Sequence, residues 1–431
     1  MNHFSTLFGR GRALLAALMI PLALLSACGG GSSSDSNAKI RLVNASIAYA
    51  SGLDLVVSDT KLASSISYGN ASSYADASAS SITTLVQSGG TTITSLSPTL
   101  SADKHYSLIA YGWAGNMKST ILQEEEDAPD ASYAKLLVLN LAADAGTLDI
   151  YLTQSVDDLS SATATVSALA GSSSSGYKTI SAGTYRVRVT GYGKNSDLRL
   201  DIPSITLSSK QVATLVITPT QGGVLVNSLL ISQQGSVSTY STSNARARVV
   251  AAVSDYGQVS ATLGGSTLMS TSIAPNIGEY QTVAAGASSL SVTVAGTAQP
   301  VATPTLTAGN DYTVLVWGEP GAPQITVMSD DNRLPTSGYA KFRLINAVAR
   351  LNAGLTMTLD YSAIATNIQP GASSSPSTVS SSSSSLLQVT SPTSGTPVYS
   401  ISDLPVTSSG VYTVFMMGSA SNIAGTLRRE R

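Results

Sequence analysis

Few side chains of this sequence are suited to catalysis or to binding a transition metal. The 431 residues include one cysteine, Cys28, and two histidines, His3 and His105. A zinc site needs clustered cysteine or histidine ligands, and a Ser–His–Asp triad needs a histidine beside its nucleophile. The sequence contains neither a GxSxG nucleophile elbow nor a GxxxxGK[ST] phosphate loop. We therefore expect no catalytic residues and no enzymatic activity.

Carboxylates are the remaining groups with possible chemistry, and they gather in two runs. Calcium takes six to eight oxygen ligands from loops of this kind. The possible calcium ligands are Glu124, Glu126, Asp127, Asp330 and Asp331. The alternative is that both runs are solvated linkers that resist aggregation. Beyond a structural calcium at these linkers, we expect no cofactor.

The first 27 residues have the pattern of a secretory signal peptide. Arg10 and Arg12 precede an apolar run over 13–25 that Pro21 interrupts, and that run is too short to span a bilayer comfortably. The following Leu25-Ser26-Ala27-Cys28 resembles a bacterial lipobox. This resemblance implies cleavage between Ala27 and Cys28, and acylation of Cys28 with chains such as palmitate. The alternative for Cys28 is an ordinary small residue at the end of a signal.

Residues 28–37 combine this cysteine with a Gly/Ser-rich segment that is typical of a flexible tether. The residue after the cysteine is Gly29 rather than aspartate, which in Gram-negative lipoproteins implies release to the outer membrane. We expect the protein to be attached to the membrane through this lipid. Whether it faces the periplasm or the cell surface is left open.

The composition favours secreted β-structure and gives no support for nucleic-acid binding. Charged residues make up 11% of the chain, with a formal net charge of −2, whereas typical proteins have about 25% charged residues. Recognition of nucleic acid generally requires a basic stripe. Abundant Ser, Thr and Val favour strands over helices.

Four similar segments, roughly 100 residues apart, indicate an internal repeat. They are AKIRLVNA from Ala38, AKLLVLN from Ala134, ARARVVAA from Ala245 and AKFRLINA from Ala340. In the first, Ile40 and Leu42 alternate with Lys39 and Arg41, which predicts a half-buried strand whose charges face outward. A later strand recurs as HYSLIAYG, DYTVLVWG and VYTVFMMG, with a weaker copy, QVATLVIT, in repeat two.

Short alternating runs separated by Gly, Ser, Asn and Pro predict antiparallel sandwiches. The fold class is therefore all-β, with tandem immunoglobulin-like β-sandwich repeats of about seven strands each. The predicted domains are a signal peptide (1–27), the lipidated cysteine with its tether (28–37), and β-sandwich repeats one (38–130), two (131–243), three (244–335) and four (336–431).

RLVNAS at 41–46, LDLVV at 53–57, SYG at 67–69 and the late YTV…G strand resemble the bacterial domain of unknown function 4397 family. The resemblance is strongest in repeats one and four. Repeat three has Ala251 where Asn44, Asn140 and Asn346 stand in the others. The resemblance implies a β-sandwich outside the cytoplasm, often in tandem, and it implies no activity.

Several local expectations accompany this organisation. Asp54 and Asp149 should pair with a first-strand cation such as Arg41. Trp113 and Trp317 either stack on sugar rings or act as core plugs or edge covers. The serine-rich segment 373–385 should be disordered, and 428–431 should form a solvated tail.

These observations favour a non-enzymatic, lipid-anchored protein of the cell envelope that acts as a surface binding or adhesion module of unknown ligand. Its partner would be a polysaccharide or another envelope protein. One alternative is a periplasmic structural or assembly factor of the outer membrane. The other is a hydrolase with an unrecognised site.

Overall fold

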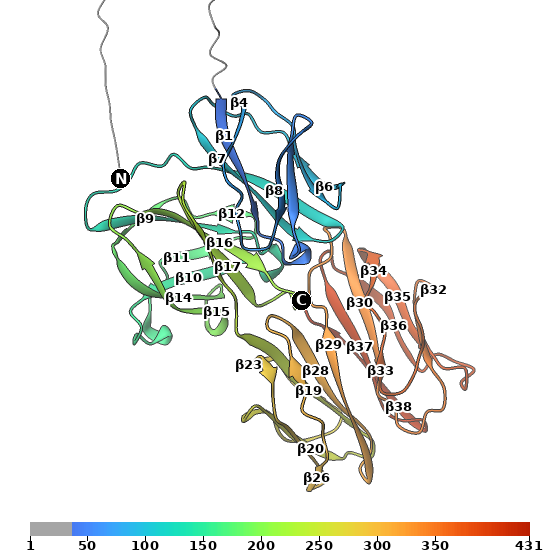
Figure 1. The fold of residues 1–431 in the computed structure, drawn as a ribbon. Helices are drawn as coiled ribbons and strands as arrows, with labels where there is room; N and C mark the ends of the chain where they lie inside the picture. Colours follow the sequence, from blue (N-terminus) through green and yellow to red (C-terminus); the bar gives the residue numbers. More distant parts are fainter. Residues whose placement is uncertain (1–36) are drawn as a thin grey trace, which may run out of the picture.

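The computed structural model describes residues 37–431, which form four β-sandwiches, each with two main sheets (Figure 1). The predicted all-β fold of tandem sandwiches is therefore confirmed. The helical elements of the described part of the chain are single 3₁₀ turns, η1 (Ile47–Tyr49), η2 (Ala143–Ala145) and η3 (Leu159–Ser161). Within 37–431, no helix is long and apolar enough to cross a membrane.

The strands of the first two repeats form two sheets each. Repeat one contains β1 (Asn37–Asn44), β2 (Leu53–Val57), β3 (Thr60–Ile66), β4 (Ala75–Ser78), β5 (Thr84–Ser88), β6 (Thr91–Leu96), β7 (His105–Trp113) and β8 (Asn116–Gln123). Repeat two contains β9 (Tyr133–Asn140), β10 (Leu148–Thr153), β11 (Val166–Leu169), β12 (Ser173–Ser174), β13 (Lys178–Ser181), β14 (Gly183–Gly191), β15 (Lys194–Leu207), β16 (Val212–Pro219), β17 (Val226–Ser232) and β18 (Val237–Tyr240).

The last two repeats follow the same plan. Repeat three contains β19 (Asn244–Val253), β20 (Gln258–Leu263), β21 (Ser266–Ile273), β22 (Asn276–Ile277), β23 (Gln281–Ala284), β24 (Gly286–Ala287), β25 (Leu290–Val294), β26 (Thr297–Gln299), β27 (Thr305–Leu306), β28 (Asp311–Glu319) and β29 (Ala322–Asp330). Repeat four contains β30 (Tyr339–Asn346), β31 (Leu355–Leu359), β32 (Ser362–Ile368), β33 (Ala372–Ser373), β34 (Ser377–Ser380), β35 (Ser382–Thr390), β36 (Tyr399–Val406), β37 (Val411–Ser419) and β38 (Asn422–Arg429).

The opening strand of each repeat lies inside its sheet and runs parallel to the late strand. In repeat one the order is β4-β1-β7-β8, and the parallel register pairs Lys39 with His105 and Asn44 with Ala110. The pairs β9–β16, β19–β28 and β30–β37 are parallel in the same way. The two sequence markers of each repeat are therefore neighbouring strands of one sheet.

Each sandwich has its own apolar core, as the alternation predicts. Ile40 and Leu42 of β1 pack against Leu53 and Leu55 of β2, and all four are fully buried. Equivalent clusters fill the other three sandwiches. This burial is the main source of stability, because no cysteine lies within residues 37–431 to form a disulfide.

In repeats one, three and four, the recurring tyrosine of the late strand anchors a neighbouring turn through its hydroxyl. The hydroxyl of Tyr106 accepts a hydrogen bond from the backbone N–H of Ser101 at 3.0 Å, and Tyr412 accepts one from Thr407 at 3.1 Å. Tyr312 does the same in repeat three. A buried ring thus fixes the turn five residues before it, much as the tyrosine corner of immunoglobulin-like sandwiches does.

The recurring asparagine at the end of the opening strand is also structural. The Nδ2 of Asn44 donates to the carbonyls of Tyr49 and Ile66, both at 2.9 Å. Its Oδ1 accepts from the N–H of Ser46 at 3.0 Å. Asn140 and Asn346 make similar bonds in repeats two and four. These side chains satisfy backbone groups where the chain leaves the strand.

The expectation that the charges of the opening strand face solvent is wrong for three arginines, although the side chain of Lys39 is 45% exposed. Arg41, Arg248 and Arg343 are all buried. Their face of the sheet also carries apolar side chains such as Val43 and Val250, and it packs against a neighbouring repeat. Repeats one and two form one such pair and repeats three and four form the other, as Figure 1 shows.

The serine-rich segment is ordered, contrary to expectation. It forms β33, β34 and the start of β35, and the ladders pair Ser377 with Phe342 and Ser382 with Val406. A strand is held by its backbone hydrogen bonds, so small polar side chains on an exposed face do not prevent pairing.

Candidate functional site

The four repeats meet around one residue of repeat two, Asp144 in the turn η2. Its Oδ2 accepts a hydrogen bond from Trp113 Nε1 of repeat one at 2.7 Å. Its Oδ1 accepts from the backbone N–H of Leu334, between repeats three and four, at 3.1 Å. Its carbonyl accepts from the guanidinium of Arg431. We call this meeting place the junction.

The expected solvated tail is instead part of the junction. Arg431 also donates to the carbonyl of Gly223 at 3.1 Å. Burial, together with the charges of Arg199 and Arg246, lowers the pKa of Arg431 to about 10. The preceding Glu430 has a side chain only 2% exposed and binds Arg248 at 2.7 Å. Residues 430–431 are held in place by these contacts, because buried carbonyl and guanidinium groups need hydrogen-bond partners.

Repeats three and four exchange ion pairs across their shared face. Arg248 of repeat three binds Glu430 of repeat four, and Arg343 of repeat four binds Asp330 of repeat three at 2.6 Å. Asp330 also accepts hydrogen bonds from Tyr280 and Thr313, each at 2.6 Å. Burial and the nearby Asp330 charge raise the pKa of Tyr280, so it remains a donor.

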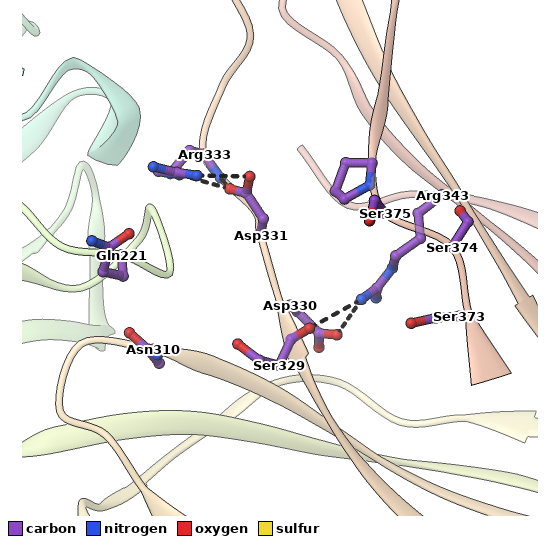
Figure 2. A pocket seen from close by; sticks show the side chains of 11 residues that line it. Gln221, Asn310, Ser329, Asp330, Asp331, Arg333, Arg343, Ser373, Ser374 and Ser375 are labelled. Carbon is purple, nitrogen blue, oxygen red and sulfur yellow. Dashed lines mark hydrogen bonds and ion pairs between the residues drawn. The ribbon is translucent and has the colours of Figure 1, made fainter. Parts of the chain in front are cut away.

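A polar pocket of about 430 Å³ lies beside these pairs. Figure 2 shows Asp331 with Arg333 and Asp330 with Arg343, and it shows the serines of 373–375 near Arg343. Burial alone would raise the pKa of the Asp331 carboxyl, but the neighbouring Arg333 and Lys341 lower this pKa to about 2. The charges of this pocket are therefore compensated by one another, and the Asp330–Arg343 pair joins repeats three and four.

A second pocket of about 330 Å³ lies by the same linker, and we call it the tryptophan pocket. Its lining residues come from the β7–β8 hairpin of repeat one, the linker, and strands β30 and β34 of repeat four: Trp113, Ala114, Asn116, Asp331, Arg333, Leu334, Pro335, Thr336, Tyr339, Lys341 and Thr378. The guanidinium of Arg333 lies 4.7 Å from the ring centroid of Trp113. This pocket combines aromatic surface with uncharged polar groups and with the charged side chains of Asp331, Arg333 and Lys341.

The predicted lipidation and cleavage residues, Cys28 and Ala27, lie outside the described residues. The two acidic runs lie at different places. Glu124 binds Arg41 at 3.0 Å and Glu126 binds Lys135, whereas Asp127 is exposed.

Asp330 and Asp331, the other predicted calcium ligands, bind Arg343 and Arg333. Within residues 37–431, no group of three or more His, Cys, Asp or Glu is placed to hold a metal ion. Calcium binding stays a prediction, and four of its five candidate ligands face cations.

The aspartates singled out in the second strands of repeats one and two have other partners than expected. Asp54 binds Lys61 at 2.7 Å rather than Arg41, because Arg41 is occupied by Glu124. Asp149 accepts hydrogen bonds from Ser167 and from backbone N–H groups. His105 lies 2.9 Å from Glu125 at the start of β7.

The two tryptophans differ in environment. A Cβ on Gly371 of repeat four would lie 2.2 Å from Cζ2 of Trp317, so the Trp317 ring packs directly over that glycine in the interface. Trp113 instead lines an open pocket. Trp317 therefore covers the interface between repeats three and four rather than filling a sandwich core, and sugar stacking by Trp113 stays a prediction.

Sequence reasoning missed Asp144, Arg333, Tyr339 and Arg431. These residues are far apart in the chain and belong to no motif, so nothing local marks them. One signal was present for the interfaces. The late strand Leu108–Ile109–Ala110–Tyr111 is apolar at consecutive positions, which is typical of a strand buried on both faces.

Comparisons with known proteins give a family and no activity. The family model described as "Domain of unknown function (DUF4397)" matches residues 38–151 and 245–353. No curated protein matches the chain.

Three solved structures show a distant likeness. A "putative cell adhesion protein" from Bacteroides fragilis is 10% identical with a TM-score of 0.15, covering 43% of this chain and 98% of that one. Another so described, from Parabacteroides distasonis, is 10% identical with a TM-score of 0.18, covering 70% and 99%. The Bacillus anthracis TIE protein is 8% identical with a TM-score of 0.15, covering 86% and 65%. At these TM-scores the likeness says nothing about function.

Proposed function

The chain belongs to the family described as Domain of unknown function (DUF4397), and we propose that it is a non-catalytic, lipid-anchored binding protein of the bacterial cell envelope. In this proposal Cys28 carries the lipid at the outer membrane, and the four fused sandwiches present a ligand site at the junction.

The observation that carries the proposal is the tryptophan pocket. A simple spacer would need only linked sandwiches, whereas here repeat one, the 331–336 linker and repeat four jointly form a solvent-open pocket. The groups that form it are held in place, since Trp113 is hydrogen-bonded to Asp144 and Arg333 to Asp331. A preformed concave site with convergent polar groups is the usual form of a ligand site.

His105 has no part in this function. It lies at the start of β7, whereas the pocket residue Trp113 lies at the end of the same strand. The substitution His105→Ala should therefore leave binding unchanged.

Protease shaving of intact cells tests the location. The four repeats are followed by immunoblot beside a periplasmic control protein, with the variant Cys28→Ser as a matched control for anchoring. We expect wild-type repeats to be cut while the control survives, and the Cys28→Ser variant to be lost from the membrane fraction. Protection of the repeats would reject a surface role and favour the periplasmic assembly alternative.

A further inference from the structure

We propose that the tryptophan pocket binds a neutral saccharide, with a pyranose ring stacked on Trp113. This inference rests on the proposed binding function and specifies its ligand class. It is carried by the chemistry, charge and size of the pocket.

The chemistry of the lining matches the two sides of a sugar ring. Trp113, Pro335 and Tyr339 offer apolar surface, and the side chain of Tyr339 is 45% exposed. Indole and phenol rings pack well against the C–H face of a pyranose and still reach polar partners at their edges. Trp113 is therefore suited to be the stacking residue.

Uncharged hydrogen-bonding groups surround this apolar surface. Asn116, Thr336, Tyr339 and Thr378 all line the pocket. Among residues 37–431, the side-chain polar atoms of these four have no protein partner within hydrogen-bond distance. An amide and three hydroxyl groups can each donate and accept, which matches the hydroxyl groups of a sugar.

The charges of the pocket are already compensated, which argues for a neutral ligand. Asp331 binds both Arg333 and Lys341. Asp144 adds a second carboxylate close enough to act on both cations. The two cations that line the pocket thus already have carboxylate partners, so an anionic ligand would have to compete with Asp331 and Asp144 for them.

Size and rigidity complete the argument. A volume of about 330 Å³ is at the lower end of the range of roughly 300–1,000 Å³ for ligand pockets. It suits one or two sugar units of a longer chain that continues into solvent. Because Asp144 and Arg333 hold the indole, little side-chain freedom is lost when a ligand binds.

The test uses the intrinsic fluorescence of the full chain. Trp113 and Trp317 are its two tryptophans, so the variant Trp317→Phe leaves Trp113 as the sole indole reporter. Maltotriose, cellotriose and chitotriose are titrated separately, and a glycan array extends the probes. We expect a saturable change in Trp113 emission with at least one neutral glycan.

Substitutions then assign the binding to this pocket. We expect Trp113→Ala, which lacks the indole reporter and is measured by calorimetry beside the wild type, to weaken binding at least tenfold. Tyr339→Ala and Asn116→Ala should weaken it several-fold. Tyr361→Ala is the matched control, because Tyr361 is 82% exposed and lies outside the pocket. Tyr339 and Asn116 have surface-accessible side chains, so these variants keep the test valid even if Trp113→Ala folds poorly.

Two results would overturn the saccharide site: no neutral glycan binds, or binding is unchanged by Tyr339→Ala and Asn116→Ala. If either result is found while protease shaving shows that the repeats are exposed, the saccharide ligand is rejected but the proposed binding role at the cell envelope is not. Glycan binding by repeats that are protected on intact cells would instead keep the saccharide site and reject the surface location.

Discussion

The guanidinium of Arg343 in repeat four lies 2.6 Å from the carboxylate of Asp330, which ends the last strand of repeat three, β29. A second ion pair joins the equivalent positions with the two repeats in swapped roles. Arg248 of repeat three binds Glu430, which follows the last strand of repeat four. Corresponding positions thus contact each other reciprocally, as in an isologous dimer interface. The pairing of repeats is a specific interface rather than a loose contact between linked domains.

Replacing Arg343 should strongly destabilise the chain. Asp330 has no exposed side-chain surface, so Arg343→Leu leaves a buried carboxylate without its cation, which typically costs about 3–5 kcal/mol. Urea unfolding followed by Trp317 fluorescence at the same interface measures the loss. The exposed pair Arg350–Glu319 provides the control, because Arg350→Ala should leave the midpoint unchanged. Equal midpoints for the two variants would contradict the assigned role of the pair.

The substitution Asn346→Ala should destabilise repeat four by about 1–3 kcal/mol, the cost of leaving buried polar groups unsatisfied. It removes the bond to the carbonyl of Ile368 at 2.8 Å and the acceptor for the N–H of Val348. Thermal unfolding of the full chain measures the effect. Asn352 is exposed, so Asn352→Ala serves as the control, and an equal loss in both variants would argue against the assigned role of Asn346.

Gly371 should not tolerate alanine, for two reasons that can be separated. Its φ is +79°, and an added Cβ would lie 2.2 Å from Trp317 Cζ2. Gly338 has a φ of +88° with nothing within 4 Å of an added Cβ. Gly338→Ala therefore reports the backbone cost alone, about 1 kcal/mol, and Gly371→Ala should cost about 1–3 kcal/mol more through overpacking. Similar melting temperatures for the two variants would show that the interface can yield at this point.

Acid should weaken the junction through Asp331. The pKa of its carboxyl is lowered from 3.8 to about 2 in the folded chain, so the folded state favours the ionised form. The resulting stabilisation, about 2 kcal/mol, is complete above pH 4 and is lost as the pH falls from 4 to 2.

The variant Asp331→Asn isolates this contribution. Its stability deficit relative to wild type should be largest near pH 6 and should shrink as the pH approaches 2. Melting temperatures of both proteins across this range provide the measurement. A deficit that does not change with pH would show that Asp331 contributes through shape rather than charge.

The sequence predicted the strands and the repeat because both depend on local alternation. Ile40 and Leu42 are in the core as expected, and the late tyrosines lie on the adjacent strand. Alternation cannot distinguish a face that meets water from one that meets another repeat, which is why Arg41, Arg248 and Arg343 were placed outside. The apolar residues on the same face as these arginines, such as Val43, were the available signal that this face is buried.

The junction could not be predicted in the same way. Asp144 joins Trp113, Leu334 and Arg431, which come from different repeats. Their proximity depends on how the two repeat pairs pack, and no residue spacing in one chain encodes that. The serine-rich segment was mispredicted for a different reason. Its composition suggested disorder, but backbone pairing to β30 and β36 makes it ordered.

The parallel pairing of β1 with β7 determines how repeat one would respond to mechanical load. Asn37 begins β1 at one end of the repeat, and Trp113 ends β7 at the other. A membrane tether pulling at Asn37 and a ligand pulling at Trp113 would act in opposite directions along two neighbouring strands. Their hydrogen bonds, from Lys39–His105 to Asn44–Ala110, would then be loaded together in shear rather than opened one after another, a geometry that resists tension along the strands.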